Sequence, residues 1–279
     1  MISLDQQFSK LVRTPDPSFN IAECALIIAQ HEYPSLDIPG YLQQLDQIAE
    51  PLRMRLPADA AKPHVISMLN HYLFRELGYA GNHDNYYDPR NSFLNDVMDR
   101  RIGIPITLSI LYMEIGRRVG VNLQGVSFPG HFLAKYVTDQ GVIVLDPFNH
   151  GISLSEADLR ERLTQSGGGD ASVDIPLSAL LRPATPHEIL VRLARNLKAI
   201  YSHAGELEKA IAMTSLILCV NRQDPGELRD RATMYYRLFC YRAALADFQQ
   251  LVEIDVDAAE DDSIRATIAE LKQKNRLLN

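Results

Sequence analysis

Cysteine is scarce in this chain. Its 279 residues include three cysteines, at positions 24, 219 and 240. An odd number of widely spaced cysteines fits neither a disulfide framework nor a four-cysteine metal site. We therefore expect small buried thiols in a reducing compartment, and neither a metal nor a cofactor.

Long apolar runs are also missing. No stretch of 18 apolar residues occurs, and the best candidate, residues 21–29, is short and contains Glu23. The sequence therefore predicts no membrane span. The first residues lack the basic and apolar regions of a secretion signal, so the expected location is the cytoplasm.

An excess of positive charge is the third absence. The chain has 28 basic and 35 acidic side chains, for a net charge of −7. Its basic residues form pairs, such as Arg100-Arg101 and Arg117-Arg118, rather than clusters. Because this balance repels a phosphate backbone, we expect no nucleic-acid partner.

What is present is an ordinary globular composition, with 46% hydrophobic and 23% charged residues. At roughly 150 residues per domain, the length predicts about two domains. A break rich in proline at residues 181–186 places the boundary, giving domains over 1–183 and 184–279. The sequence does not indicate an oligomeric state.

The first domain changes period along its length. Helical spacing of apolar residues predicts helices over 18–31, 39–54 and 62–77. A short helix capped by Asn91 or Ser92 ends at residue 100, and a long apolar helix follows over 106–119. Pro105 and Gly120 mark the two ends of that long helix. Alternating residues then predict strands over 123–128, 131–136 and 142–145, followed by a loop and a short helix within 152–163. The first domain is therefore expected to combine helices with strands.

The last hundred residues are helical and repeat with a period of 34. At this offset Tyr201 aligns with Tyr235, Gly205 with Phe239, and Ala210 with Ala244. Paired helices with this period are typical of tetratricopeptide (TPR) repeats. A plain helical bundle is the alternative.

One pair of residues in the predicted hairpin could carry chemistry. If Tyr136 faces Gly141 across the turn, the register places His131 opposite Asp146. Directly opposed residues share a face with Cβ atoms about 4.5–5.5 Å apart. A carboxylate at that distance can orient an imidazole and stabilise its charged form, as a general base requires.

The same pair also has a purely structural interpretation. A His–Asp bridge could simply pin the hairpin, and a register slip of one residue would separate the two side chains. Pro129-Gly130 before His131 and Pro147 after Asp146 place both at one edge of the sheet, where a cleft could form. Both interpretations stay open at the level of sequence.

Three segments of the chain resemble a known family. Residues 91–109 (NSFLNDVMDRRIGIPITLS), 128–133 (FPGHFL) and 145–149 (LDPFN) are closely similar to the bacterial SirB-type family. The resemblance covers nearly the whole chain. It implies a transglutaminase-like domain with a papain-like α+β core and N-terminal helices, followed by an all-α TPR-like domain. It also implies a Cys–His–Asp triad in active relatives.

The triad is incomplete when it is transferred to this sequence. The family's histidine and aspartate correspond to His131 and Asp146, whereas the cysteine that begins the central helix corresponds to Pro105. Thr107 and Ser109 lie nearby, but a hydroxyl has a much higher pKa than a thiol. The resemblance therefore implies a dyad without its nucleophile.

Four further residues are candidates for binding a ligand beside this dyad. Tyr86 and Tyr87 precede the central helix and could line a cleft, Asn91 lies between them and that helix, and Asn149 follows Asp146 by three residues. Turn formation and core packing are the alternatives for each of the four.

Two functions from different classes fit these observations. The first is a non-catalytic or catalytically retired transglutaminase-like protein that binds a protein or peptide through its TPR-like region and its cleft. The second is a hydrolase or acyl-transferase that uses His131 and Asp146 without the usual cysteine.

Overall fold

A computed structural model describes residues 4–13, 19–139, 141–165 and 175–277 of the chain. Its contacts divide the chain into two compact units. The sheet unit consists of residues 17–193, and the helical unit consists of residues 1–16 together with 194–279. The predicted domain boundary at residues 183/184 stays a prediction.

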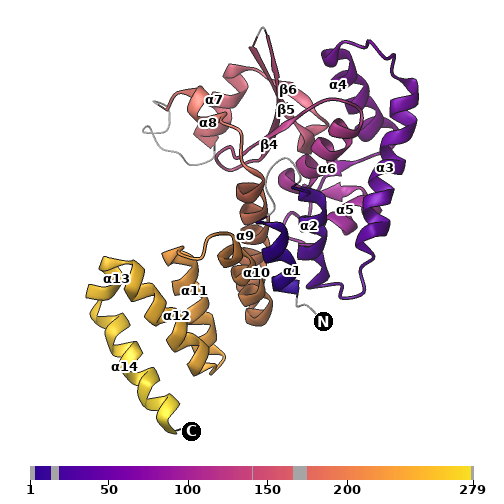
Figure 1. The fold of residues 1–279 in the computed structure, drawn as a ribbon. Coiled ribbons are helices and arrows are strands. Elements are labelled where there is room, and N and C mark those ends of the chain that lie inside the picture. Colours follow the sequence, from indigo (N-terminus) through magenta and orange to yellow (C-terminus); the bar gives the residue numbers. More distant parts are fainter. Residues whose placement is uncertain (1–3, 14–18, 140, 166–174, 278–279) are drawn as a thin grey trace. The chain divides into compact units, whose positions relative to one another are not determined.

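The sheet unit begins with helices (Figure 1). They are α2 (Ile21–Gln30), α3 (Ile38–Arg55), α4 (Lys62–Asn70), the π-helix η1 (His71–Glu76), α5 (Leu94–Arg100) and α6 (Pro105–Arg118). The helix expected over 18–31 is α2, whose N-cap is Asn20, and residue 18 lies outside the described residues. A short parallel pair, β1 (Ala80–Gly81) and β2 (Ile102–Gly103), was not predicted.

A four-stranded antiparallel sheet follows. Its order is β3 (Gln124–Val126), β4 (Leu133–Thr138), β5 (Gly141–Asp146) and β6 (Ile152–Leu154). Figure 1 shows this sheet between α6 on one side and α7 (Glu156–Gln165) with α8 (Leu177–Leu180) on the other. Leu159 and Leu163 of α7 pack on Val144 of β5. The strand β6 occupies part of the segment that the sequence assigned to a loop.

The long apolar helix is α6, and it lies at the centre of the sheet unit. It packs against α2, α3 and α5 and against β3 and β4. Pro105 takes the first helical position, where a missing N–H costs nothing. Gly120, with φ of +81°, follows the helix end. The sequence prediction for this helix is confirmed within one residue at each end.

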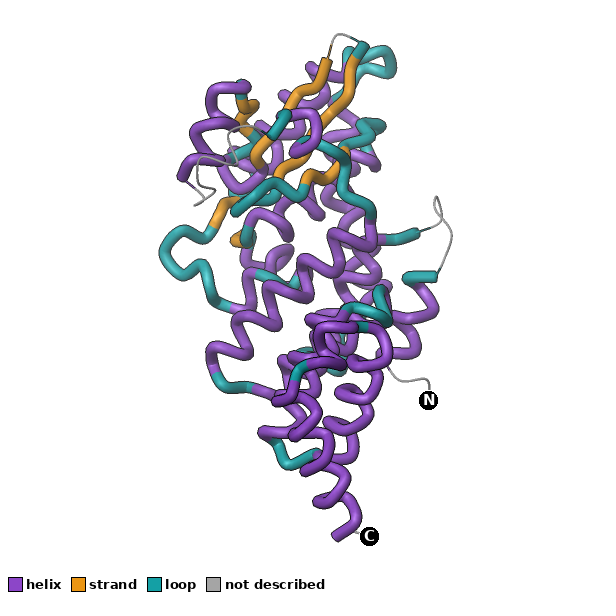
Figure 2. Tube along the Cα trace, turned by 90° about the vertical axis from the view of Figure 1, so that its left-hand side faces the viewer, coloured by secondary structure: helices purple, strands orange, loops and turns teal. Residues whose placement is uncertain are grey.

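The helical unit contains α1 (Leu4–Leu11), the C-terminal part of α9 (Pro186–Ala204), α10 (Leu207–Val220), α11 (Pro225–Arg237), α12 (Tyr241–Ile254), α13 (Val256–Glu260) and α14 (Asp262–Leu277). Figure 2 shows the strands of the described residues in the sheet unit alone. The α+β class with an all-α C-terminal part is therefore confirmed. Within the described residues, no helix combines the length and the apolar character needed to cross a bilayer.

The 34-residue repeat corresponds to two helix pairs, α9–α10 and α11–α12. Gly205 and Phe239 end the first helix of each pair, and both have a positive φ, of +75° and +60°. Ala210 and Ala244 occupy equivalent positions in the second helix of each pair, and both are fully buried. Small side chains at these positions allow the paired helices to approach closely.

Candidate functional site

His131 and Asp146 are in contact, but the strands pair differently from the prediction. Nε2 of His131 lies 2.9 Å from Oδ1 of Asp146. The hairpin pairs Thr138 with Gly141, whereas the predicted register paired Tyr136 with Gly141. His131 therefore precedes β4 and reaches Asp146 diagonally. The predicted register was wrong by two residues, and a shift of two keeps side chains on the same face, which preserves the contact.

The Asp146 carboxylate is fully buried and surrounded by donors. Its Oδ1 also accepts the backbone N–H groups of Phe148 and Asn149, at 3.1 and 3.3 Å. Its Oδ2 accepts the side-chain amide of Asn149 at 2.7 Å and forms an ion pair with Arg162 at 2.7 Å. Both oxygens therefore have several partners inside the chain.

These contacts keep Asp146 ionised. Burial raises the pKa of its carboxyl, but the hydrogen bond and charge of His131, the amide of Asn149 and the charge of Arg162 together lower that pKa below its ordinary value. Arg162 comes from α7, whose leucines pack on the face of the sheet that carries Val144. No sequence pattern marks Arg162 as part of the site, because only the folded sheet brings α7 to the end of β5.

His131 is held through its backbone as well as its ring. Its carbonyl oxygen accepts a hydrogen bond from Arg192 at 2.8 Å, and Arg192 also donates to the carbonyl of Phe128 at 3.2 Å. The side chain of His131 is 16% exposed. Within the part of the chain that the structure describes, Nδ1 of His131 has no hydrogen-bond partner. This nitrogen is therefore available to a ligand.

Aromatic rings lie beside His131. The ring of Phe148 lies 5.8 Å from the imidazole of His131, 4.5 Å from that of His83 and 6.2 Å from the ring of Tyr86. Tyr86 is 38% exposed, and Tyr87 is 76% exposed. The predicted binding residues Tyr86 and Asn149 thus lie in the neighbourhood of the dyad. Phe148 and His83 were not singled out in the sequence.

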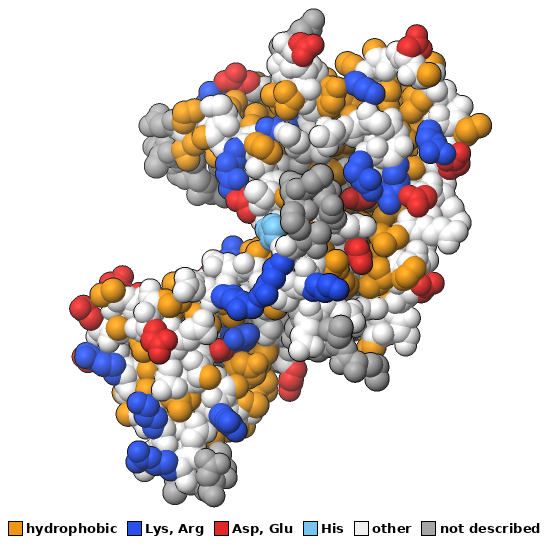
Figure 3. Space-filling view, in the orientation of Figure 1, with side chains coloured by type: hydrophobic (Ala, Val, Ile, Leu, Met, Phe, Trp, Pro, Cys, Tyr) orange, Lys and Arg blue, Asp and Glu red, His pale blue; other side chains and the backbone are white. Residues whose placement is uncertain are grey.

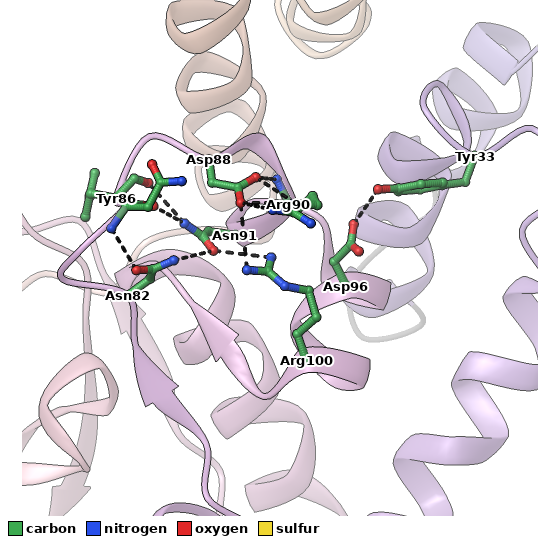
Figure 4. Close-up of polar contacts among 9 residues, drawn as sticks. Tyr33, Asn82, Tyr86, Asp88, Arg90, Asn91, Asp96 and Arg100 are labelled. Atoms are coloured by element: carbon green, nitrogen blue, oxygen red, sulfur yellow. Dashed lines mark hydrogen bonds and ion pairs between the residues drawn. The ribbon is translucent and has the colours of Figure 1, made fainter.

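Asn91 is fully buried, and both the nitrogen and the oxygen of its side-chain amide form hydrogen bonds (Figure 4). Its amide nitrogen donates to the carbonyl oxygens of Asn85, at 2.7 Å, and Tyr86, at 3.3 Å. Its Oδ1 accepts from Asn82 at 3.1 Å and from Arg100 at 3.4 Å. This geometry favours a positioning role, in which Asn91 fixes the loop that carries Tyr86.

The same asparagine connects that loop to the start of α6. Its carbonyl oxygen accepts the hydroxyl of Thr107 at 2.7 Å, and that hydroxyl accepts the N–H of Ile104 at 3.2 Å. Thr107 therefore caps α6 in place of an N-cap side chain. Its hydroxyl is committed to this capping role and is fully buried.

The start of α6 offers no reactive side chain. Pro105 is buried and has neither a donor nor a nucleophilic atom in its side chain. Ser109 is fully buried, and its hydroxyl has no hydrogen-bond partner, so no base activates it within the described residues. The sheet unit has a single cysteine, Cys24, in α2. Burial raises the pKa of the Cys24 thiol to about 12.

We expect Cys24 to be chemically inert in the folded protein. Because its thiol is fully buried and protonated at neutral pH, a maleimide should modify Cys240 rapidly and Cys24 only after unfolding in denaturant. Mass spectrometry of peptides after timed labelling checks this. Labelling of Cys24 in the native protein at the rate seen for Cys240 would contradict it.

The lowered pKa of Asp146 implies that the stability of the protein depends on pH. Its pKa is lowered on folding, so its contribution is complete above the unfolded pKa of about 3.9 and is lost as the pH falls through the folded-state pKa. The free energy of unfolding of the native chain should therefore approach that of Asp146→Asn below about pH 4. Urea titrations of both proteins from neutral to acidic pH measure this, and a constant difference would exclude it.

Comparisons with known proteins agree with this architecture. Residues 40–195 match the transglutaminase-like superfamily, and residues 197–272 match the tetratricopeptide repeat. A human F-box only protein 21 is 38% identical over 86 residues, which cover 31% of this chain and 14% of that protein.

Two bacterial relatives match nearly the whole chain. A UPF0162 protein of Xylella fastidiosa strain Temecula1 is 38% identical over 267 residues, which cover 96% of this chain and 95% of that protein. A UPF0162 protein of Pseudomonas aeruginosa is 30% identical over 249 residues, which cover 89% of this chain and 90% of that protein. The chain therefore belongs to the UPF0162 family and joins a transglutaminase-like domain to tetratricopeptide repeats.

Proposed function

We propose that this protein is a protein- or peptide-binding module whose transglutaminase-like domain does not perform cysteine-dependent acyl transfer. The observation that carries the proposal is Pro105 at the first position of α6, where the SirB-type resemblance expects the nucleophile. Acyl transfer through a triad needs a thiolate that attacks the carbonyl carbon. Proline cannot supply it, and Cys24 is a buried, protonated thiol.

The state of the dyad supports the same proposal. The Asp146 carboxylate is saturated by His131, Asn149, Arg162 and backbone N–H groups, and it is closed to solvent. Such an arrangement pins β5 to α7 and to the loop before β4. The tetratricopeptide repeats supply a second argument, because stacked helix pairs form extended surfaces that bind other proteins. A regulatory role in the cytoplasm stays a prediction.

A second candidate is a hydrolase or acyl-transferase that uses the dyad alone. The observation that favours it is Nδ1 of His131, which is available while Nε2 is oriented by Asp146. A water or substrate amine bound at Nδ1 could lose its proton to the imidazole. The side chain of His131 is 16% exposed, so a small molecule such as water can reach part of it.

A peptide-display selection on the full-length protein tests the binding proposal. We expect reproducible enrichment of peptides relative to an unrelated helical protein. Synthetic copies should compete with one another, and the control variant His64→Ala, which changes an exposed histidine, should bind them unchanged. The absence of any enriched peptide would contradict the proposal.

A further inference from the structure

Two hollows in the helical unit share part of their lining, and the pair is called the groove below. The first is lined by Gln6, Ser9, Lys10, Arg13, Cys219 and Arg222 and has a volume of about 490 Å³. The second is lined by Ser215, Leu218, Cys219, Arg222, Leu228, Arg231, Tyr235 and Gln250 and has a volume of about 540 Å³. Cys219 and Arg222 line both hollows, so the two are neighbours. Each volume is typical of a ligand site.

The packing of α1 creates the first hollow. Phe8 and Val12 are buried, at 1% and 5% exposure, and α1 contacts α10 in the same unit. The opposite face of this segment is polar and presents Lys10 and Arg13 outwards. Lys10 of α1 and Arg13 of the turn after it therefore line the same hollow as Arg222, which follows α10.

The groove has cations without matching anions. Neither set of lining residues includes an Asp or a Glu. Among the described residues, the side chains of Lys10, Arg13 and Arg222 have no ion-pair partner. Elsewhere in the same unit, Arg195 and Lys198 each pair with two carboxylates. Three unpaired cations along one groove are notable in a chain with a net charge of −7.

The other end of the groove is rigid and partly apolar. Arg231 is held by Asp247 through two contacts of 2.8 Å and donates to Ser215 at 3.0 Å, so its charge is already compensated. Leu218 and Leu228 are buried beneath this end. Figure 3 shows hydrophobic side chains (orange) and Lys or Arg side chains (blue) on the visible face of the helical unit.

We infer that this groove binds an acidic peptide segment, with carboxylates against Lys10, Arg13 and Arg222 and an apolar side chain against the end that contains Leu218 and Leu228. The inference rests on the proposed peptide-binding function and names its site and the charge of its partner. Charge complementarity selects the acidic partner, because unpaired cations attract carboxylates and repel basic segments. The apolar end favours a peptide over a nucleic acid.

Fluorescence anisotropy with matched probes tests this inference. The probes are a short fluorescein-labelled peptide that combines a run of Glu with one Leu, and the same peptide with every Glu replaced by Gln. The full-length protein should bind the Glu peptide at least about tenfold more tightly, and added salt should weaken that binding. Equal affinity for both peptides would overturn the inference.

Two double variants locate the site. Arg13→Gln/Arg222→Gln removes two cations from the groove, whereas Lys272→Gln/Arg276→Gln removes two exposed cations of α14 outside it. We expect about a tenfold loss of affinity for the Glu peptide in the first variant and none in the second. Equal losses in both would show a non-specific charge effect and overturn the inference. Thermal unfolding confirms that both variants are folded.

The outcomes separate this inference from the proposed function. If display selects neutral peptides that the groove variant still binds, the binding function stands and the inference of an acidic peptide in the groove is wrong. If display selects no peptide, both are wrong. A single-stranded RNA that binds more tightly than the Glu peptide, and that loses affinity in the groove variant, would overturn the choice of a peptide.

Discussion

Replacing Asp146 with alanine should destabilise the sheet unit by about 3–5 kcal/mol. The carboxylate is fully buried, and its loss leaves the guanidinium of Arg162, the imidazole of His131 and the amide groups of Asn149 without their acceptor. A buried donor that has lost its acceptor destabilises the folded state by more free energy than the original hydrogen bond contributed. This is the largest single-residue effect that we expect in the protein.

Native-state hydrogen exchange of the amides in β4 and β5 measures this loss at the site itself. The matched control is Asp139→Ala, which removes an exposed aspartate from the turn between the same strands. We expect that control to change the opening free energy by less than about 0.5 kcal/mol. An Asp146→Ala protein with unchanged protection would contradict the structural role of the carboxylate.

Replacing Asn91 with alanine should cost about 2–3 kcal/mol. The substitution removes two donors and one acceptor from a fully buried position, and it leaves the carbonyl oxygens of Asn85 and Tyr86 without this partner. The loop that carries Tyr86 would lose its tie to Asn82 and Arg100. Exchange of the amides near residues 82–91 should therefore accelerate first.

Asn122→Ala is the control for this prediction, because Asn122 is exposed. Thermal unfolding of the three proteins compares the two asparagines directly. An Asn91→Ala protein as stable as Asn122→Ala would mean that the network in Figure 4 contributes little, and it would return Asn91 to the group of candidate binding residues.

The hairpin shows how far a sequence can locate this site. Alternating residues predicted two strands and a turn, and both strands are present. The register depended on the turn, which the sequence left unclear, and the predicted pairing was two residues off. Since the side-chain period of a strand is two, this error kept His131 and Asp146 on one face and preserved their contact.

The repeat was easier to predict, because its signal is distributed over many positions. Gly205 and Phe239 share a left-handed backbone, although only glycine adopts it without strain. Ala210 and Ala244 share complete burial. A period of 34 thus identified equivalent positions even where the residue types differ.

Contacts between distant segments could not be predicted. Arg162 reaches Asp146 from α7, and Arg192 reaches the carbonyl of His131 from α9. Neither arginine carries a local signal that distinguishes it from an ordinary surface residue. The role of Asn91 was likewise hidden, because its partners are mostly backbone carbonyls and side chains of a polar loop.

Turnover by the full-length protein tests the central claim most directly. Amide and ester hydrolysis, and incorporation of a labelled amine into a glutamine-containing peptide, should be measured for the native chain, for His131→Ala and for His64→Ala, which changes an exposed histidine. We predict that all three proteins match the blank without protein. Turnover that persists in His64→Ala and disappears in His131→Ala would contradict the account and establish an enzyme that works without the cysteine.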